Sequence, residues 1–205
     1  MRILGKDEVT SSILVSSFFH ARKQIVSGFC DHDRRIGDMT KFEAFEQIIR
    51  MLRSPGGCPW DREQTHESLK PACIEEAAEL LGAINMYART GNAANMKEEL
   101  GDLLLQVVMH AVIAEEEGLF TMDEVIDTVS EKMIRRHPHV FGDAKADTSD
   151  QVLRSWEQIK QQEKKGRPDE KVWLAEAFNE SCELIEVARK RKGLTAQDLP
   201  VQADQ

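Results

Sequence analysis

Cysteine, proline and tyrosine are scarce in this chain of 205 residues, and their scarcity excludes several classes of protein. The four cysteines, Cys30, Cys58, Cys73 and Cys182, form no C-x-x-C pair, so the sequence contains neither a zinc or redox motif nor a disulfide framework. We therefore expect a reducing, cytoplasmic setting. Six prolines and one tyrosine stand among many good helix formers, and this composition favours an all-α fold.

Long apolar runs and an excess of positive charge are absent as well. No segment approaches the roughly 20 apolar residues that a membrane-spanning helix needs, and the apolar stretch at 13–19 is a poor signal peptide. The formal net charge of −9 leaves no broad basic surface, so we expect no nucleic acid polymer and no membrane as partner. A small phosphorylated ligand that arrives with its own metal remains compatible with this charge.

What the sequence does contain is a set of carboxylates on two consecutive predicted helices: Glu75, Glu76, Glu79, Glu99 and Asp102. At about 100° per residue, the first three share one helical face and the last two share a face of the next helix. Apolar residues at helical spacing surround them, so the acids lie beside or within a stripe that should be buried. Burial of several like charges is costly unless a cation neutralises them, and oxygen ligands suit Mg²⁺, with Mn²⁺ as a substitute. The sequence therefore predicts a metal site on a helical bundle, without indicating which acid would serve as general base.

Periodicity and capping signals divide the rest of the chain into helices. We expect helices over 42–52, 68–88, 95–117, 121–137, 149–164 and 170–191, with Asn95 and Thr121 as N-terminal caps and glycines at several ends. Residues 1–38 read as an N-terminal extension of unknown role, 39–165 as the catalytic domain, and 166–205 as a C-terminal helix and tail.

Several blocks of the sequence, taken together, resemble one enzyme family. Glu75-Glu76-x-x-Glu79 and Glu99-x-x-Asp102 resemble the E-E-x-x-E…E-x-x-D signature of the MazG nucleoside triphosphate pyrophosphohydrolases. Blocks at 57–66, 99–108, 135–143 and 156–160 are similar to further segments of that family, in order. The resemblance, over residues 40–165, implies a MazG-like all-α bundle completed by dimerisation. It also implies Mg²⁺-dependent hydrolysis of nucleoside triphosphates to monophosphate and pyrophosphate, in nucleotide pool clean-up or control. Because the chain has one copy of the motif, we expect a homodimer or a dimer of dimers.

Basic and aromatic residues are the expected contacts for the substrate. These substrate-binding candidates are Trp60, Lys132, Arg135, Arg136, Trp156 and Lys160. The resemblance supports Lys160 as a phosphate ligand. For Arg135 and Arg136 an equal alternative is stabilisation of a helix C-terminus through the dipole, and for Trp60 it is core packing. For Trp156 core packing comes first and contact with the ligand second.

Two other functions fit part of the pattern. Glu63-x-x-His66 matches the E-x-x-H pattern of a carboxylate di-metal redox bundle, but such sites need two copies and this chain has one. The other alternative is a non-enzymatic helical dimer whose acids are solvated. His110, in an apolar run, is expected to be a hydrogen-bonded core histidine.

Overall fold

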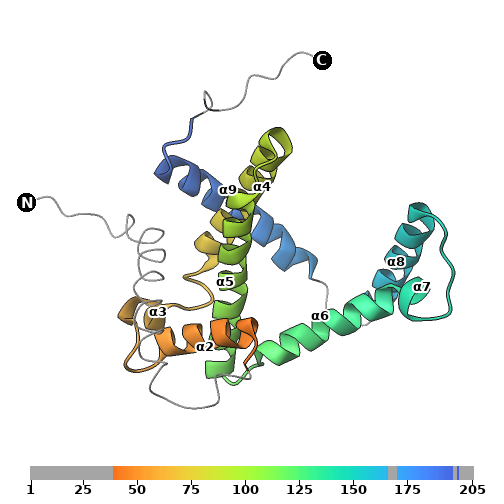
Figure 1. Cartoon of the computed structure of the whole chain (residues 1–205), viewed down its shortest axis with the longest axis horizontal. Coiled ribbons are helices and arrows are strands. Elements are labelled where there is room, and N and C mark those ends of the chain that lie inside the picture. The colour runs from red at the N-terminus through yellow and green to blue at the C-terminus, as the bar shows by residue number, and fades with distance from the viewer. Residues whose placement is uncertain (1–38, 166–169, 196–197, 199–205) are drawn as a thin grey trace, which may run out of the picture. The chain divides into compact units, whose positions relative to one another are not determined.

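The computed structural model describes residues 39–165, 170–195 and 198. The secondary-structure elements in that part of the chain are all helices, without strands (Figure 1). This confirms the prediction of an all-α fold. None of the described helices is long and apolar enough to span a membrane. The predicted extension 1–38 lies outside the described residues. The helices are α2 (Lys41–Arg53), α3 (Pro59–Glu63), α4 (Lys70–Thr90), α5 (Ala94–Glu116), α6 (Met122–Arg136), α7 (Pro138–Phe141), α8 (Ser149–Lys164) and α9 (Lys171–Arg191).

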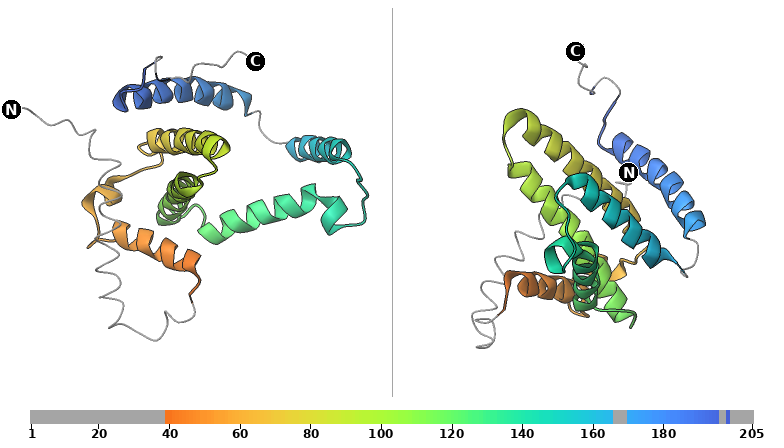
Figure 2. Two further views of the ribbon diagram at one scale, coloured as in Figure 1. Left: turned by 45° about the horizontal axis from the view of Figure 1, so that its top comes forward. Right: turned by 90° about the vertical axis from the view of Figure 1, so that its right-hand side faces the viewer.

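The chain divides into two compact units, residues 1–47 and 48–205, and the boundary falls within α2. In the second unit, α4 and α5 are the helices that pack most extensively on each other. Gly91 ends α4 with a φ of 72°, a left-handed conformation that glycine adopts without strain. The short link that follows returns the chain, so that α5 runs back along α4 (Figure 2). The buried core side chains concentrate in α5, with Val108 and Val112 almost fully covered.

Helix caps follow the sequence in two places and depart from it in a third. Thr121 and Glu124 form the predicted capping box at the start of α6, and the side chain of Thr148 caps α8. The prediction of Asn95 as a cap is wrong, because α5 begins one residue earlier and Asn95 lies in its first turn. Its amide donates instead to Glu99 Oε1 at 2.9 Å, since an acceptor four residues along a helix is within reach.

Two short helices, α3 and α7, occur where the sequence predicted only breaks. Each has a proline at its start, where the missing N–H and the fixed φ favour a new helical turn. Before α3 the chain passes close to the end of α2: a Cβ at Gly57 would lie 2.2 Å from the carbonyl oxygen of Leu52. The N–H of Cys58 donates to that same carbonyl at 2.8 Å, so this close approach is held in place.

Helices α6, α7 and α8 form an arm that leads away from the end of α5 (Figure 1). Glu163 on α8 fastens the arm, because it accepts hydrogen bonds from Arg135 at 2.7 Å and Arg136 at 2.6 Å. The Arg136 guanidinium also lies 5.1 Å from the ring centroid of Trp156. The arm is therefore held together by its own charge pairs and ring contacts.

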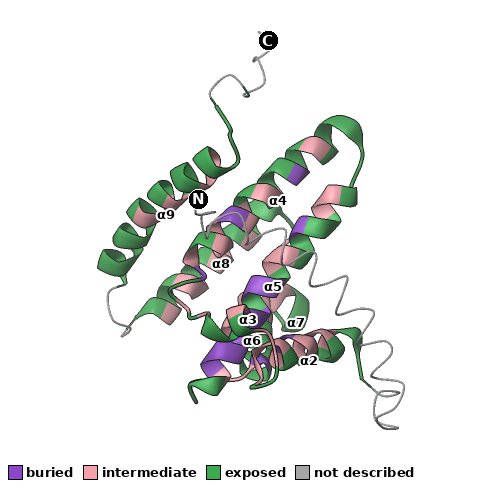
Figure 3. Cartoon of the chain, turned by 90° about the vertical axis from the view of Figure 1, so that its left-hand side faces the viewer, coloured by how far each residue is buried: buried purple, intermediate pink, exposed green. Residues whose placement is uncertain are grey.

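Helix α9 packs against α4, as α5 does, but far more of its surface is exposed (Figure 3). None of its described side chains is buried, and Trp173 and Phe178 are 73% and 66% exposed. Lys70 at the start of α4 lies 3.2 Å from a carboxylate oxygen of Glu180. The contact between α9 and α4 thus depends largely on charged side chains.

Candidate metal centre

The carboxylates predicted from the sequence lie on the two helices at the centre of the second unit. One oxygen each from Glu76, Glu79 and Glu99 lies within 4.8 Å of the other two, and we call these three residues the carboxylate cluster. Two members come from α4 and one from α5, so the cluster forms only because the helices pack side by side. It is the one such group of potential metal ligands found in the described part of the chain.

Three acids of this region, Glu76, Glu99 and Asp102, have a raised pKa. Burial raises the pKa of Glu76 to about 7, and the neighbouring charges of Glu79, Asp102 and Glu99 add to the effect. Burial is also the main cause of a raised pKa at Glu99 and at Asp102. The charge of the cluster is therefore incompletely compensated by the protein itself.

Glu75 and Asp102, the remaining two predicted ligands, lie outside the cluster in different ways. Glu75 is buried, with 7% of its surface exposed, and its carboxylate is paired with Arg191 and Lys192 at the C-terminal end of α9. Asp102 is half-buried, and its pKa is raised by burial and by Glu98 and Glu79, which places its charge beside the cluster. Both remain close enough to influence what binds there.

Arg191 and Lys192 are the two residues near the site that sequence analysis missed. Lys192 Nζ lies 3.1 Å from Glu75 and also hydrogen-bonds Glu79, which belongs to the carboxylate cluster. A basic last turn is common on helices because it favours the dipole, so nothing in the local sequence marked these residues as distinctive.

The donor set of the cluster fits a divalent cation such as Mg²⁺. Its three ligand atoms are all carboxylate oxygens, the donor type that hard cations prefer, and like charges held this close are stabilised by a cation between them. No histidine or cysteine of the described residues joins the group, so its composition does not suit zinc or a thiolate-bound metal.

The histidine that could have supported a redox site has other partners. His66 Nδ1 lies 2.8 Å from Nδ1 of His110, with the two rings stacked, and His110 Nε2 lies 3.3 Å from Cys73. Burial, followed by the charge of His66, lowers the pKa of His110. His110 has the polar partners expected of it but is half-buried rather than part of the core, and the E-x-x-H pattern at 63–66 does not turn its histidine toward the cluster.

The predicted substrate contacts are mostly on the arm. Arg135 and Arg136 bind Glu163, and Lys160 lies 3.7 Å from Glu157 on its own helix. Lys132 is half-buried on α6, and Trp156 contacts His137 edge-on. Because the arm leads away from α4 and α5 (Figure 1), a single chain does not bring these side chains to the carboxylate cluster.

Trp60 does not belong to this arm. It is half-buried on α3, next to a buried carboxylate. Its neighbour Asp61 is buried, and Asp61 Oδ1 has no hydrogen-bond partner among the described residues. Burial raises the pKa of Asp61, although Cys58 and Arg53 act in the opposite direction. The structure assigns Trp60 to neither the core nor the carboxylate cluster.

The α4 and α5 pair also exposes large apolar side chains. The exposed fractions are 64% for Leu81 and 51% for Leu100, and the other large apolar side chains exposed on these two helices are Ile84, Tyr87, Leu104 and Val107; we call this set the exposed apolar flank. Exposure of this kind along the helices that hold the acids marks a surface suited to protein contact.

Comparison with known proteins relates this part of the chain to one family. Residues 64–141 match the family model of the MazG nucleotide pyrophosphohydrolase domain. The chain is 57% identical over 123 residues to the nucleoside triphosphate pyrophosphohydrolase/pyrophosphatase MazG of Thermotoga maritima, covering 60% of this chain and 45% of that protein. Identity with the nucleoside triphosphate pyrophosphohydrolase of Escherichia coli K12 is 45% over 127 residues, or 62% of this chain and 47% of that protein.

Two further proteins are similar over a comparable share of the chain. The uncharacterized protein YabN of Bacillus subtilis is 56% identical over 124 residues, which cover 60% of this chain and 24% of YabN. The crystal structure of a MazG-related protein from Thermotoga maritima covers 58% of this chain and 98% of its own, with 28% identity and a TM-score of 0.47. The chain spans between a quarter and a half of the length of the curated relatives named here.

Proposed function

We propose that this chain, whose residues 64–141 match the model of the MazG nucleotide pyrophosphohydrolase domain, hydrolyses nucleoside triphosphates to monophosphate and pyrophosphate. The reaction depends on a divalent cation, Mg²⁺ above all, with Mn²⁺ as a substitute. The observation that carries the proposal is the carboxylate cluster, because all three of its residues lie within the matched range. Control or clean-up of the nucleotide pool is the corresponding cellular role.

In this mechanism the acids of α4 and α5 perform two tasks. Glu76, Glu79 and Glu99 would hold the cation, with Asp102 beside them. A divalent cation bound there would supply neutralisation of phosphate charge and a more acidic water. A carboxylate of the set that is not engaged with the cation accepts the proton of the attacking water. The water oxygen bonds to the α-phosphorus, the bond to the oxygen between the α- and β-phosphorus breaks, and pyrophosphate leaves.

The cations that bind the triphosphate come from the arm of a second copy of this chain. This part of the proposal is supported by the arm's direction away from the cluster and by the exposed apolar flank of α4 and α5 (Figure 1). Lys132 and Lys160 are the better candidates, because Arg135 and Arg136 already share the Glu163 carboxylate. The active assembly is thus a homodimer or a dimer of dimers.

The test is product analysis with the purified full-length chain. With Mg²⁺ and a panel of nucleoside triphosphates, we expect monophosphate and pyrophosphate in equal amounts, and orthophosphate only after a separate pyrophosphatase is added. Chelation of the metal abolishes the reaction. Direct release of orthophosphate and a nucleoside diphosphate would contradict the proposal.

Assembly is tested on the same sample by light scattering. A mass of at least two chains is expected at micromolar concentration, and Leu81→Glu, on the exposed flank, lowers both the mass and the activity. Val172→Glu, at an exposed position of α9 outside both the flank and the arm, serves as a matched control for the added charge. A fully active monomer would rule out the shared site.

A further inference from the structure

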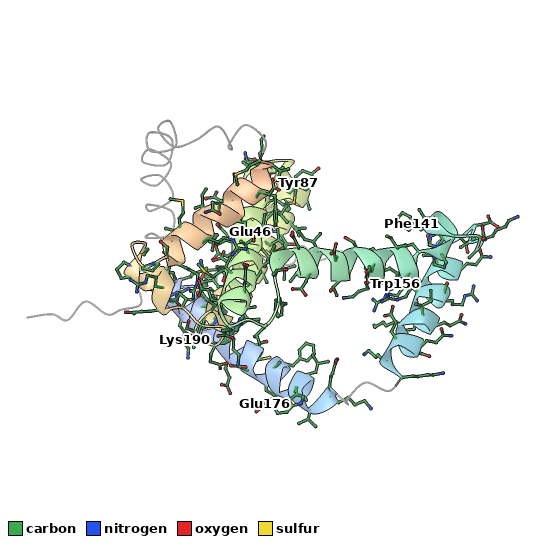
Figure 4. All side chains as sticks on the ribbon, turned by 90° about the horizontal axis from the view of Figure 1, so that it is seen from below. Glu46, Tyr87, Phe141, Trp156, Glu176 and Lys190 are labelled. Atoms are coloured by element: carbon green, nitrogen blue, oxygen red, sulfur yellow. The ribbon has the colours of Figure 1, made fainter. Side chains whose placement is uncertain are left out.

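The C-terminal end of α9 touches the carboxylate cluster itself. Lys192 hydrogen-bonds Glu79, one of the three clustered acids, and lies 3.1 Å from Oε1 of Glu75. Arg191 pairs with the same Glu75. Figure 4 labels Lys190 in this last turn, at the end of α9 that lies against the α4 and α5 pair, and Glu176 toward the other end. One positive charge, that of Lys192, therefore contacts an acid of the proposed metal site, and Arg191 lies beside it on Glu75.

An ammonium group and a divalent cation compete for such a carboxylate. The ammonium of lysine is a compact charge with hydrogen-bond donors, and it binds the same oxygens that a hard cation prefers. If a divalent cation binds at Glu79, it also repels the ammonium group that lies there. Occupation of Glu79 by Lys192 therefore lowers the affinity of the cluster for a metal.

The contact between Lys192 and Glu79 lies where it can be released. Lys192 is the C-terminal cap of α9, and Gly193 follows with a φ of 67°, so the contact lies where helical order ends. The two side chains of this pair are 34% and 30% exposed, and an ion pair so exposed to solvent contributes little stability. Loss of the contact with Glu79 thus leaves the packing of α4 on α5 intact.

We propose that the end of α9 is a built-in competitor of the divalent cation: Lys192 occupies Glu79 in the metal-free protein and leaves it when the metal binds. This inference rests on the metal site of the proposed function. It goes beyond that function because it gives α9, a helix outside the MazG-matched region, a part in controlling how tightly the site binds its metal.

Metal binding by the full-length protein tests this competition. Mn²⁺ is the probe, and free Mn²⁺ is followed by electron paramagnetic resonance without any nucleotide. Lys192→Gln keeps the length of the side chain and removes its charge, and we expect Mn²⁺ to bind about ten times more tightly than in the original protein. Lys190→Gln removes the same charge from the same exposed turn, and we expect a change of less than about twofold.

Each outcome of this titration decides something. Equal tightening in both variants shows a general charge effect and overturns the inference. Equal Mn²⁺ affinity in the original protein and in Lys192→Gln overturns the inference but leaves the metal site in place. Absence of Mn²⁺ binding in all three proteins overturns the inference and the proposed metal site together.

Hydrogen exchange supplies a readout that does not depend on affinity. In the original protein, Mg²⁺ should accelerate amide exchange in residues 189–193, because the last turn of α9 loses its contact with Glu79. The start of α9 near Lys171 should be unaffected. Unchanged exchange in the last turn on saturation with Mg²⁺ would show that the helix end does not leave, and would overturn the proposal.

Discussion

Glu76 on α4 and Glu163 on α8 are the same residue type in the same chain, yet their carboxyl groups behave in opposite ways. Burial and the charges of Glu79, Asp102 and Glu99 raise the pKa of Glu76 to about 7. Hydrogen bonds from Arg136 and Arg135 lower the pKa of Glu163 to about 2. Glu163 has its counter-charge within its own arm, whereas the region around Glu76 has too little and can gain more by binding a cation.

This difference distinguishes an acid that supports the fold from the acids proposed to bind a cation. It also changes the interpretation of Arg135 and Arg136, for which phosphate binding and stabilisation of the helix C-terminus were equal alternatives. Both are committed to Glu163, so phosphate can reach them only in competition with that carboxylate. We expect variants of the two glutamates to differ most in catalytic activity and less in stability.

Catalytic activity should separate the two glutamates most strongly. Glu76→Gln removes a cation ligand, and we expect pyrophosphate release with Mg²⁺ to fall by about a thousandfold. Glu163→Gln should lower it by less than about tenfold, because the arm is loosened rather than lost. Glu98→Gln, on the exposed face beside Glu99, is the control for removal of an acid near the site. Full activity in Glu76→Gln would show that Glu76 does not hold the cation.

Stability without metal should respond to pH in a direction set by Glu76. Its pKa rises from 4.5 when unfolded to about 7 when folded, so the folded state binds the proton more tightly. The contribution of the Glu76 carboxyl group to the free energy of unfolding is therefore fully present below pH 4.5 and is lost as the pH rises to about 7. At pH 8, Glu76→Gln should be more stable than the original protein by about 1–2 kcal/mol, a value reduced for partial solvation.

Urea unfolding with a chelator, at pH 4.5 and pH 8, measures this effect. The advantage of Glu76→Gln should disappear at the lower pH, where the original carboxyl is protonated. Addition of Mg²⁺ at pH 8 should stabilise the original protein more than the variant, because binding to the folded state shifts the equilibrium. A variant less stable than the original at pH 8 would show that the acids do not repel one another.

Glu163 should show the opposite dependence on pH. Its pKa falls from 4.5 to about 2 on folding, so its contribution is present above pH 4.5 and is lost as the pH falls toward 2. Glu163→Gln should have a lower urea midpoint at pH 7, and the difference from the original protein should shrink below pH 4. A difference that does not depend on pH would mean that the hydrogen bonds of Glu163 do not depend on its charge.

The smallest expected effect distinguishes the two arginines of the arm. The Arg136 side chain is 15% exposed and that of Arg135 is 48% exposed, so Arg136→Gln should lower the urea midpoint more than Arg135→Gln. For substrate binding the order should differ: Lys132→Gln should raise KM, and Arg135→Gln should change it by less than about twofold. An equal rise in KM for Lys132→Gln, Arg135→Gln and Arg136→Gln would indicate that the two arginines also bind phosphate.

The features predicted from the sequence are those that depend on neighbouring residues. The spacing of Glu76 and Glu79 puts two acids on one turn of helix, and the capping box at Thr121 is complete within four residues. The contact between Lys192 and Glu79 spans 113 residues, and no periodicity reports which helix end meets which face. The link between Arg136 and Glu163 was missed for the same reason, because each residue looks solvated on its own helix.

Gly56 and Gly57, which precede α3, differ in how well they should tolerate substitution. Any side chain at Gly57 would collide with the carbonyl oxygens of Met51 and Leu52, at 2.3 Å and 2.2 Å from the new Cβ. A Cβ at Gly56 would meet nothing within 4 Å. In a saturation library, position 57 should therefore retain only glycine, while position 56 should accept most replacements, which makes it a place to attach a reporter group.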